Sequence, residues 1–141
     1  MGLKISTKGR YALRLMVDLA QNNNGEFISL KDVAGRQDVS MKYLEQIVSQ
    51  LTRAGYLHSV RGPLGGYKLV REPAGYTVAE VLRVTEGNLA PVACLELERN
   101  LCARSENCLT LPVWEGLYRG IARYLESITL QDIIDGKVDA P

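Results

Sequence analysis

The feature that most restricts the fold of this chain is a five-residue run, Gly62-Pro63-Leu64-Gly65-Gly66. Three glycines and a proline favour a turn and disfavour both helix and strand. Two short segments with strand character, residues 57–60 and 67–70, flank the run. We therefore predict a β-hairpin whose loop is this run.

Three helices are predicted before the hairpin, because apolar residues recur at helical spacing after each of three capping positions. The caps are Ser6 or Thr7 for the first helix, Ser29 for the second and Ser40 for the third. The first helix stops at residues 22–25, Gly35 weakens the second soon after its start, and the third ends near Gly55. Residues 36–39 form a turn of the length that a helix-turn-helix needs.

The second half of the chain is predicted to be helical around one long loop. We expect a helix at residues 77–84, a loop without periodicity at 88–111, a long helix from Pro112 to Ile128 and a short helix at 130–134. The fold class is therefore mainly α with a small β-hairpin. We expect a winged helix-turn-helix DNA-binding domain in residues 1–75 and a helical dimerisation region with a long C-terminal helix in residues 76–141.

The long helix carries a broad apolar stripe that includes Trp114, Leu117, Ile121 and Leu125. Such a stripe is often protein core, but a short winged-helix domain cannot cover it alone. We therefore expect a homodimer through this helix. The symmetry would place two recognition helices about 34 Å apart, or a multiple of that distance.

Charge is divided between the two halves, although the net charge is only +1. Residues 1–75 carry 11 Lys and Arg against 6 Asp and Glu, whereas residues 76–141 carry 6 against 10. This asymmetry indicates nucleic acid or a membrane as the partner of the basic half. The chain has neither a long apolar run nor a signal peptide, so we expect a cytoplasmic protein with no membrane partner.

The basic half offers groups that can meet double-stranded DNA, although a solvated polar face is the alternative interpretation. Glu45 would be repelled by phosphates unless it accepts a hydrogen bond from a base, for instance a cytosine amino group. At the hairpin tip, Arg61 suits a narrow minor groove and Gly62 lets the backbone approach DNA. The other candidates are Ser40, Lys42, Tyr43, Gln46 and Arg53 on the third helix and Lys4, Lys8, Arg10 and Arg14 near the first.

All three cysteines, Cys94, Cys102 and Cys108, lie in the predicted loop. Their spacing is too open for a zinc-ribbon pair, and an odd number fits a disulfide framework poorly. Clustered thiolates in a cytosolic protein suit an iron–sulfur cluster, which usually has four ligands. Buried inert thiols and a thiol redox switch are the alternatives.

Three segments resemble the signature segments of the IscR-type iron–sulfur cluster regulators, whose winged-helix relatives include CymR and NsrR. The segments are residues 5–12 (Ile-Ser-Thr-Lys-Gly-Arg-Tyr-Ala), Tyr43-Leu44-Glu45-Gln46, and residues 59–67 (Ser-Val-Arg-Gly-Pro-Leu-Gly-Gly-Tyr). The resemblance covers about residues 3–130. It implies a homodimeric bacterial transcription factor that binds a pseudo-palindromic operator. It further implies that Glu45 reads bases, that Arg61 reaches the minor groove, and that Ser40 and Lys42 lie near the DNA.

The resemblance also implies a 2Fe-2S cluster bound by three cysteines and a histidine. This chain departs from that pattern because Leu111 matches the histidine position and the first gap between cysteines is two residues longer. The aspartate that serves as a ligand in nitric-oxide sensors is matched by Arg10. The fourth ligand is therefore unassigned, and a 2Fe-2S cluster is favoured over 4Fe-4S. The candidates for the fourth place are Glu96, Glu98, Glu106 and an exogenous ligand such as water, with the single histidine, His58, disfavoured by its place on the hairpin.

Two regulatory functions follow as hypotheses, and an enzyme is excluded. The first is a transcriptional regulator controlled by a cluster at the three cysteines, with iron–sulfur cluster biogenesis genes as its targets. The second is a CymR-like repressor without a cluster, controlled by thiol redox state or by a partner enzyme. An enzyme lacks support because the one histidine lies far from the cysteines in sequence and no phosphate loop or paired-carboxylate motif is present.

Overall fold

The computed structural model describes residues 4–97 and 103–139. The first part of the chain contains the three predicted helices and the hairpin. Their bounds are α1 Thr7–Gln21, α2 Leu30–Gln37, α3 Met41–Arg53, β1 Leu57–Val60 and β2 Gly66–Leu69. Ser6, Ser29 and Ser40 each accept a hydrogen bond from the backbone N–H three residues on, which confirms the three helix starts.

Two local predictions in this half are corrected. The second helix does not weaken at Gly35 but continues to Gln37, and it ends at Asp38 in the left-handed conformation (φ 54°). The backbone N–H of Val39 then donates to the carbonyl of Ala34, which satisfies one of the terminal helix acceptors. The second strand lies one residue earlier than predicted, because Gly66 pairs with Val60.

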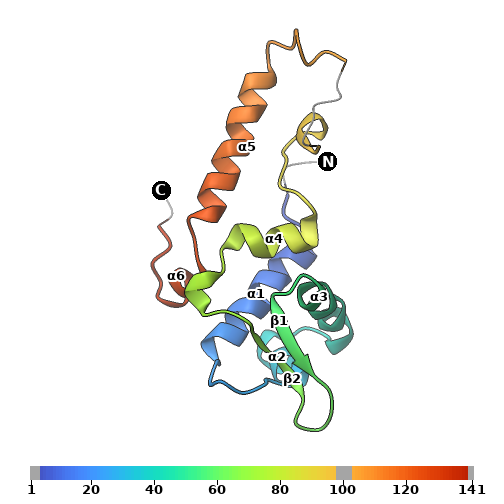
Figure 1. Cartoon of the computed structure of the whole chain (residues 1–141), viewed down its shortest axis with the longest axis vertical. Helices are drawn as coiled ribbons and strands as arrows, with labels where there is room; N and C mark the ends of the chain where they lie inside the picture. Colours follow the sequence, from blue (N-terminus) through green and yellow to red (C-terminus); the bar gives the residue numbers. More distant parts are fainter. Residues whose placement is uncertain (1–3, 98–102, 140–141) are drawn as a thin grey trace.

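The second half is helical, with two short 3₁₀ turns that the periodicity did not indicate. One of these turns lies inside the segment predicted as a plain loop, and the long helix ends at Glu126 rather than at Ile128. The elements are η1 Pro73–Gly75, α4 Val78–Glu86, η2 Ala93–Leu95, α5 Leu111–Glu126 and α6 Leu130–Ile134. Figure 1 shows α5 extending away from the body of the molecule, at the end opposite the hairpin.

One hydrophobic core joins elements from both halves. Leu15 and Met16 of α1 and Leu51 of α3 pack in the same buried cluster as Tyr76 and Leu130. Since α4 and α6 both contact α1, the expected division near residue 75 does not coincide with a gap between two cores. We retain that division as a proposed division of function.

The long helix α5 is only partly covered. Tyr118, Ile121 and Leu125 pack against a small cluster centred on α4, and Arg83 of α4 donates to Glu126 at 2.7 Å. Val113 and Trp114, nearer the start of α5, remain 59% and 37% exposed. Among the described residues, no helix is long and apolar enough to cross a membrane.

Candidate nucleic-acid interface and cysteine loop

Helix α3 has one buried face and one exposed polar face. Its apolar residues Leu44, Ile47, Val48 and Leu51 are at most 1% exposed. On the opposite face Lys42, Glu45 and Gln46 are exposed. The helix is therefore fixed by its core face, and its polar face is free to enter a groove of DNA.

Ser40 and Tyr43, both candidate DNA contacts, also contribute to the structure at the start of α3. The Ser40 hydroxyl accepts a hydrogen bond from the backbone N–H of Tyr43 at 3.2 Å. The half-buried ring of Tyr43 packs edge-on against Tyr11 of α1, with 5.8 Å between ring centroids. This contact joins α3 to α1 near the start of both helices.

The cationic residues near α1 differ in how they are held. Lys4 and Arg10 are exposed and Lys8 is half-buried, and Arg10 donates to Thr7 of its own helix. Arg14 donates to the side chain and the carbonyl of Gln37 at 3.0 and 3.1 Å, and its guanidinium lies 4.9 Å from the Tyr11 ring. Arg14 therefore links α1 to α2, a role that sequence spacing did not indicate.

The hairpin projects from the body as a wing, with Arg61 and Gly62 exposed at its tip. The backbone N–H of Gly65 donates to the carbonyl of Gly62 at 2.9 Å, which closes the turn. Below the turn, Tyr67 exchanges two backbone hydrogen bonds with Ile28, at 2.8 and 2.9 Å. The Ile28 carbonyl lies so close to Gly66 that a Cβ atom there would collide with it, so the wing requires glycine at this position.

Lys68 and His58 face each other across the two strands of the wing. The Lys68 ammonium lies 4.6 Å from the centroid of the Phe27 ring, so a cation lies on the wing in addition to Arg61. Sequence reasoning missed Lys68, although a lysine in a strand next to a glycine-rich turn was a readable signal. His58 is exposed on β1.

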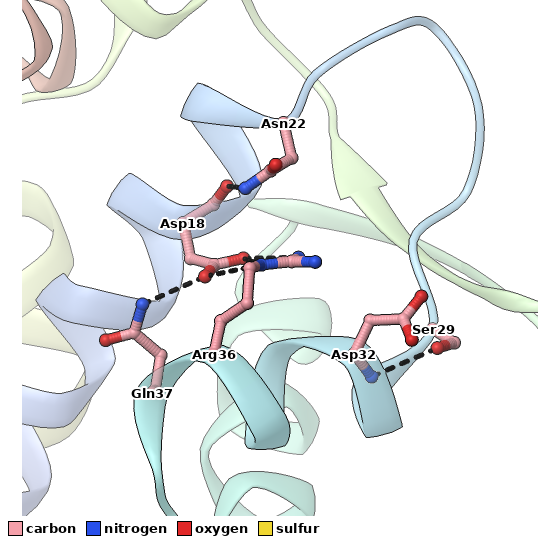
Figure 2. Close-up of polar contacts among 6 residues, drawn as sticks. All are labelled: Asp18, Asn22, Ser29, Asp32, Arg36 and Gln37. Atoms are coloured by element: carbon pink, nitrogen blue, oxygen red, sulfur yellow. Dashed lines mark hydrogen bonds and ion pairs between the residues drawn. The ribbon is translucent and has the colours of Figure 1, made fainter.

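A buried carboxylate fixes α2 against α1 (Figure 2). Asp18 is only 2% exposed although it is charged. It accepts hydrogen bonds from both Nε and Nη2 of Arg36, the shortest at 2.8 Å, and from Gln37 at 2.9 Å. The hydrogen bond to Asp18 raises the pKa of the Arg36 guanidinium. Sequence reasoning missed this network, although an aspartate on the apolar face of the first helix was a readable signal.

A second contact joins α4 to the start of α1. Glu86, the last residue of α4, accepts from the backbone N–H and the hydroxyl of Ser6 at 2.9 and 2.5 Å. A Cβ atom at Gly9 would collide with the Glu86 carboxylate, so glycine there permits the close approach. The same corner borders an open pocket of about 360 Å³ that is also lined by Tyr124 of α5.

The cysteine segment, residues 87–110 between α4 and α5, is described in part. Cys94 lies in η2 and Cys108 lies three residues before α5, and both are free, half-buried thiols. Cys102 and Glu98 lie outside the described residues. Within residues 4–97 and 103–139, no three or more His, Cys, Asp or Glu side chains come together as a metal site.

The thiol of Cys108 lies beside groups that favour its ionised form. Its Sγ lies 3.4 Å from the hydroxyl of Thr110. Hydrogen bonds from the Thr110 side chain and backbone, and to a lesser extent the charge of Arg104, lower the pKa of Cys108. Soft thiolate donors suit an iron–sulfur cluster, so the chemistry of the two described thiols fits such a group.

Comparison with known proteins gives one consistent result. The model of the Rrf2 family, described as "Iron-dependent Transcriptional regulator", matches residues 5–136. The transcriptional regulator CymR of Bacillus subtilis is 40% identical over 141 residues, covering 98% of this chain and 96% of that protein. IscR of Cereibacter sphaeroides is 39% identical over 139 residues, covering 96% and 90%.

A solved structure shows the same fold. The structure titled "T. potens IscR" superposes with a TM-score of 0.75 at 41% identity, over 96% of this chain and 89% of that one. The family and the two relatives are transcriptional regulators and not enzymes, which confirms the exclusion of an enzyme.

Proposed function

The chain belongs to the Rrf2 family of transcriptional regulators, which bind DNA, and from this premise we propose that it acts as a homodimer on a pseudo-palindromic operator, under the control of an iron–sulfur cluster. We further propose that it works in the cytoplasm and that its targets include genes for iron–sulfur cluster biogenesis, as the resemblance to IscR-type regulators implies.

The observation that carries the DNA-binding assignment is the division of α3 into a buried apolar face and an exposed polar face. Lys42, Glu45 and Gln46 would lie in the major groove, and Arg61 with Gly62 would lie in the adjacent minor groove. Phosphate contacts would come from Lys4, Lys8 and Arg10 near the start of α1, and Ser40 and Tyr43 would lie beside the DNA at the start of α3.

The proposed dimer uses the exposed part of α5. Trp114 and Val113 are large apolar residues exposed to solvent in the single chain, and Leu117 lies one helical turn further along. A second copy of α5 would cover them. Because α5 and the wing lie at opposite ends of the molecule, the angle between two α5 helices would set the separation of the two wings.

The thiolates of Cys94, Cys102 and Cys108 would hold the cluster, with 2Fe-2S favoured over 4Fe-4S and the fourth ligand unassigned. When bound, such a cluster supplies a redox-active iron centre. The chain's own response would be to order the segment between α4 and α5. This segment begins next to Glu86, which contacts the start of α1, so ordering it would act on both α5 and the DNA-binding half.

A second candidate function keeps the DNA-binding half and dispenses with the cluster. In this case the cysteines act as a thiol redox switch, or a partner enzyme controls the protein, as in a CymR-like repressor. The observation that favours this candidate is Leu111, which stands at the family histidine position and begins α5. Identity to CymR and to IscR is almost equal, at 40% and 39%, and does not separate the two.

Anaerobic purification followed by an absorption spectrum and by iron and sulfide analysis tests the cluster directly. We expect coloured protein that contains iron and acid-labile sulfide, and each Cys→Ala variant should lose both. Operator binding by Cys102→Ala should differ from that of the wild-type protein only when iron and sulfide are supplied. Colourless wild-type protein, or identical binding curves for the two proteins, would support the second candidate.

A salt titration of DNA binding tests the basic surface. The logarithm of the binding constant should fall with the logarithm of the salt concentration, by about 0.9 for each neutralised phosphate. A binding constant that does not change with salt would contradict the assignment of Lys4, Lys8, Arg10 and Lys42 to DNA.

A further inference from the structure

We propose that Tyr76 is a positioning residue for DNA recognition, because its hydroxyl fixes the base of the wing that carries Arg61. This inference rests on the proposed function, since it assigns a role within DNA binding. Tyr76 lies 15 residues beyond Arg61 in the sequence and does not belong to the wing.

The Tyr76 hydroxyl joins the two ends of the hairpin. It donates a hydrogen bond to the carbonyl of Tyr56, the residue before β1, at 2.7 Å. It accepts hydrogen bonds from the backbone N–H groups of Val70 and Arg71, the two residues after β2, at 2.9 and 3.1 Å. One donation and two acceptances use the full capacity of a phenol, so this single oxygen adds a further link below the last strand pair, Leu57 with Leu69.

The ring of Tyr76 is held rigidly. It is 0% exposed in the core shared by α1 and α3. It packs edge-on against the Tyr56 ring with 6.0 Å between centroids. The guanidinium of Arg71 lies 5.0 Å from the centroids of both rings, and it donates to the Gly75 carbonyl at 3.0 Å and to Glu80 of α4 at 2.6 Å. A hydroxyl on so restrained a ring has a fixed position to which the wing is attached.

The backbone of Tyr76 connects the same point to the start of α6, which follows α5 after a three-residue linker. Its carbonyl accepts a hydrogen bond from Leu130 at 3.1 Å, and the next residue, Thr77, pairs with Thr129. Residues 127–129 join α5 to α6. The base of the wing and the start of α6 are therefore held by one residue, so Tyr76 relates the position of the wing to the point where the chain leaves α5 for α6.

Replacing Tyr76 by Phe separates this role from a purely structural one, because Phe keeps the buried ring and removes only the hydroxyl. The probe is a duplex enriched from a random-sequence pool by the wild-type protein. We expect Tyr76→Phe to weaken binding to it by about fivefold. The three hydrogen bonds of the hydroxyl would be lost, and the part of that loss that reaches DNA binding should be about the net stabilisation of one hydrogen bond. In an Arg61→Ala background the same change should weaken binding by less than about twofold, because the position of the wing affects DNA binding through Arg61.

Tyr56→Phe is the matched control. In the described structure the Tyr56 side-chain hydroxyl forms no hydrogen bond, and the hydrogen bond to Tyr76 uses its backbone carbonyl. We expect the control to bind the duplex as the wild-type protein does. Equal losses for Tyr76→Phe with and without Arg61, or no loss at all, would overturn the positioning role.

Two further measurements keep the inference testable if Tyr76→Phe folds poorly. Arg71→Gln leaves the hydroxyl in place and removes the cation from both rings, and we expect a loss of about twofold that also depends on Arg61. In the wild-type protein, the amide hydrogens of Val70 and Arg71 should exchange as slowly as those of the core helices. Fast exchange would overturn the inference.

If the wild-type protein enriches no duplex, the proposed function fails together with this role. If the wild-type protein binds the duplex and Tyr76→Phe binds it equally well, this role alone is contradicted.

Discussion

Two carboxylates, Glu45 and Asp18, have opposite surroundings, and we propose different roles for them. Glu45 is exposed on the outer face of α3 with no ion-pair partner among the described residues. Asp18 is buried, its charge is neutralised by Arg36, and it accepts a further hydrogen bond from Gln37. An exposed acid facing DNA repels phosphates and is useful only when it reads a base, whereas a buried and paired acid holds two helices together.

Replacing Glu45 by Gln should reduce discrimination between bases and increase non-specific binding. Discrimination at one position of each half-site should fall by about tenfold, because in the proposed assignment the carboxylate accepts a hydrogen bond from a base. Affinity for random-sequence DNA should rise, because one repulsive charge is removed. Binding assays with single-base variants of the selected duplex measure both effects. Lys42→Gln is the control, and it should weaken binding to all sequences alike and lower the salt slope by about 1.

Replacing Asp18 by Asn should destabilise the fold by about 2 kcal/mol, because Arg36 loses its charged partner. The loss is smaller than for a fully buried ion pair, because the Arg36 side chain remains partly open to water. Urea unfolding followed by circular dichroism measures the change. Asp32→Asn, on the exposed side of the same helix α2, should change stability by less than about 0.5 kcal/mol. Equal effects of the two variants would contradict the assignment of Asp18 as the link between α1 and α2.

The lowered pKa of Cys108 predicts the pH dependence of its alkylation. Only the thiolate reacts, so the rate should reach half its maximum at a lower pH than for an ordinary thiol. A protein with Cys94→Ser and Cys102→Ser isolates this thiol for reaction with iodoacetamide. Adding Thr110→Val removes the hydroxyl that stabilises the thiolate and should move the midpoint to higher pH. A midpoint that does not change with Thr110 would contradict this cause.

At the scale of elements, the wing depends on contacts outside its own strands. Its two strands are four residues each, and an isolated hairpin of this size is at best marginally stable in water. Three attachments compensate for this: the Ile28 bridge, the close approach of Ile28 to Gly66, and the Tyr76 hydroxyl. The wing is therefore an extension of the core rather than a free arm.

Two Gly→Ala substitutions should change stability in opposite directions. Gly66→Ala places a Cβ against the Ile28 carbonyl and should destabilise the protein by about 2 kcal/mol while weakening binding to the selected duplex. Gly35→Ala lies in α2 with open space around its Cβ position and should stabilise it by about 0.5–1 kcal/mol. Thermal unfolding of both variants checks the signs. If Gly66→Ala left the thermal stability unchanged, the wing would not depend on its close contact with Ile28.

At the scale of the whole molecule, the division of charge follows the division of the proposed functions. The basic residues 1–75 contain α3 and the wing, and the acidic residues 76–141 contain α5 and the cysteine segment. The acidic half would lie away from the DNA in a dimer, because α5 extends opposite the wing. A near-neutral protein can in this way present a basic surface to a polyanion.

Disrupting the exposed face of α5 should separate the two copies. Leu117→Glu places a charge within the apolar stripe, and we expect monomers by sedimentation. Affinity for the full operator should fall by about a hundredfold or more, since each copy would then bind a half-site alone. Arg119→Glu changes an exposed residue of the same helix and should leave the dimer intact. A Leu117→Glu protein that still sediments as a dimer would contradict the proposed interface.

The sequence by itself determined the helices, the hairpin and the family, because these depend on local signals. Capping serines act on backbone groups three residues away, helical periodicity repeats within a turn, and Gly62 to Gly66 form a turn by their own geometry. The exposed face of α3 follows from the same periodicity, so Lys42, Glu45 and Gln46 were predictable as candidate contacts.

Only the tertiary structure decided which residues position that interface. Asp18 meets Arg36 across 18 residues, Tyr76 meets Tyr56 across 20, and Ser6 meets Glu86 across 80. A hydrogen bond between groups this far apart in sequence depends on how several elements pack together, and no local pattern encodes that arrangement. Sequence therefore indicates which side chains are available to DNA, and packing determines where they are held.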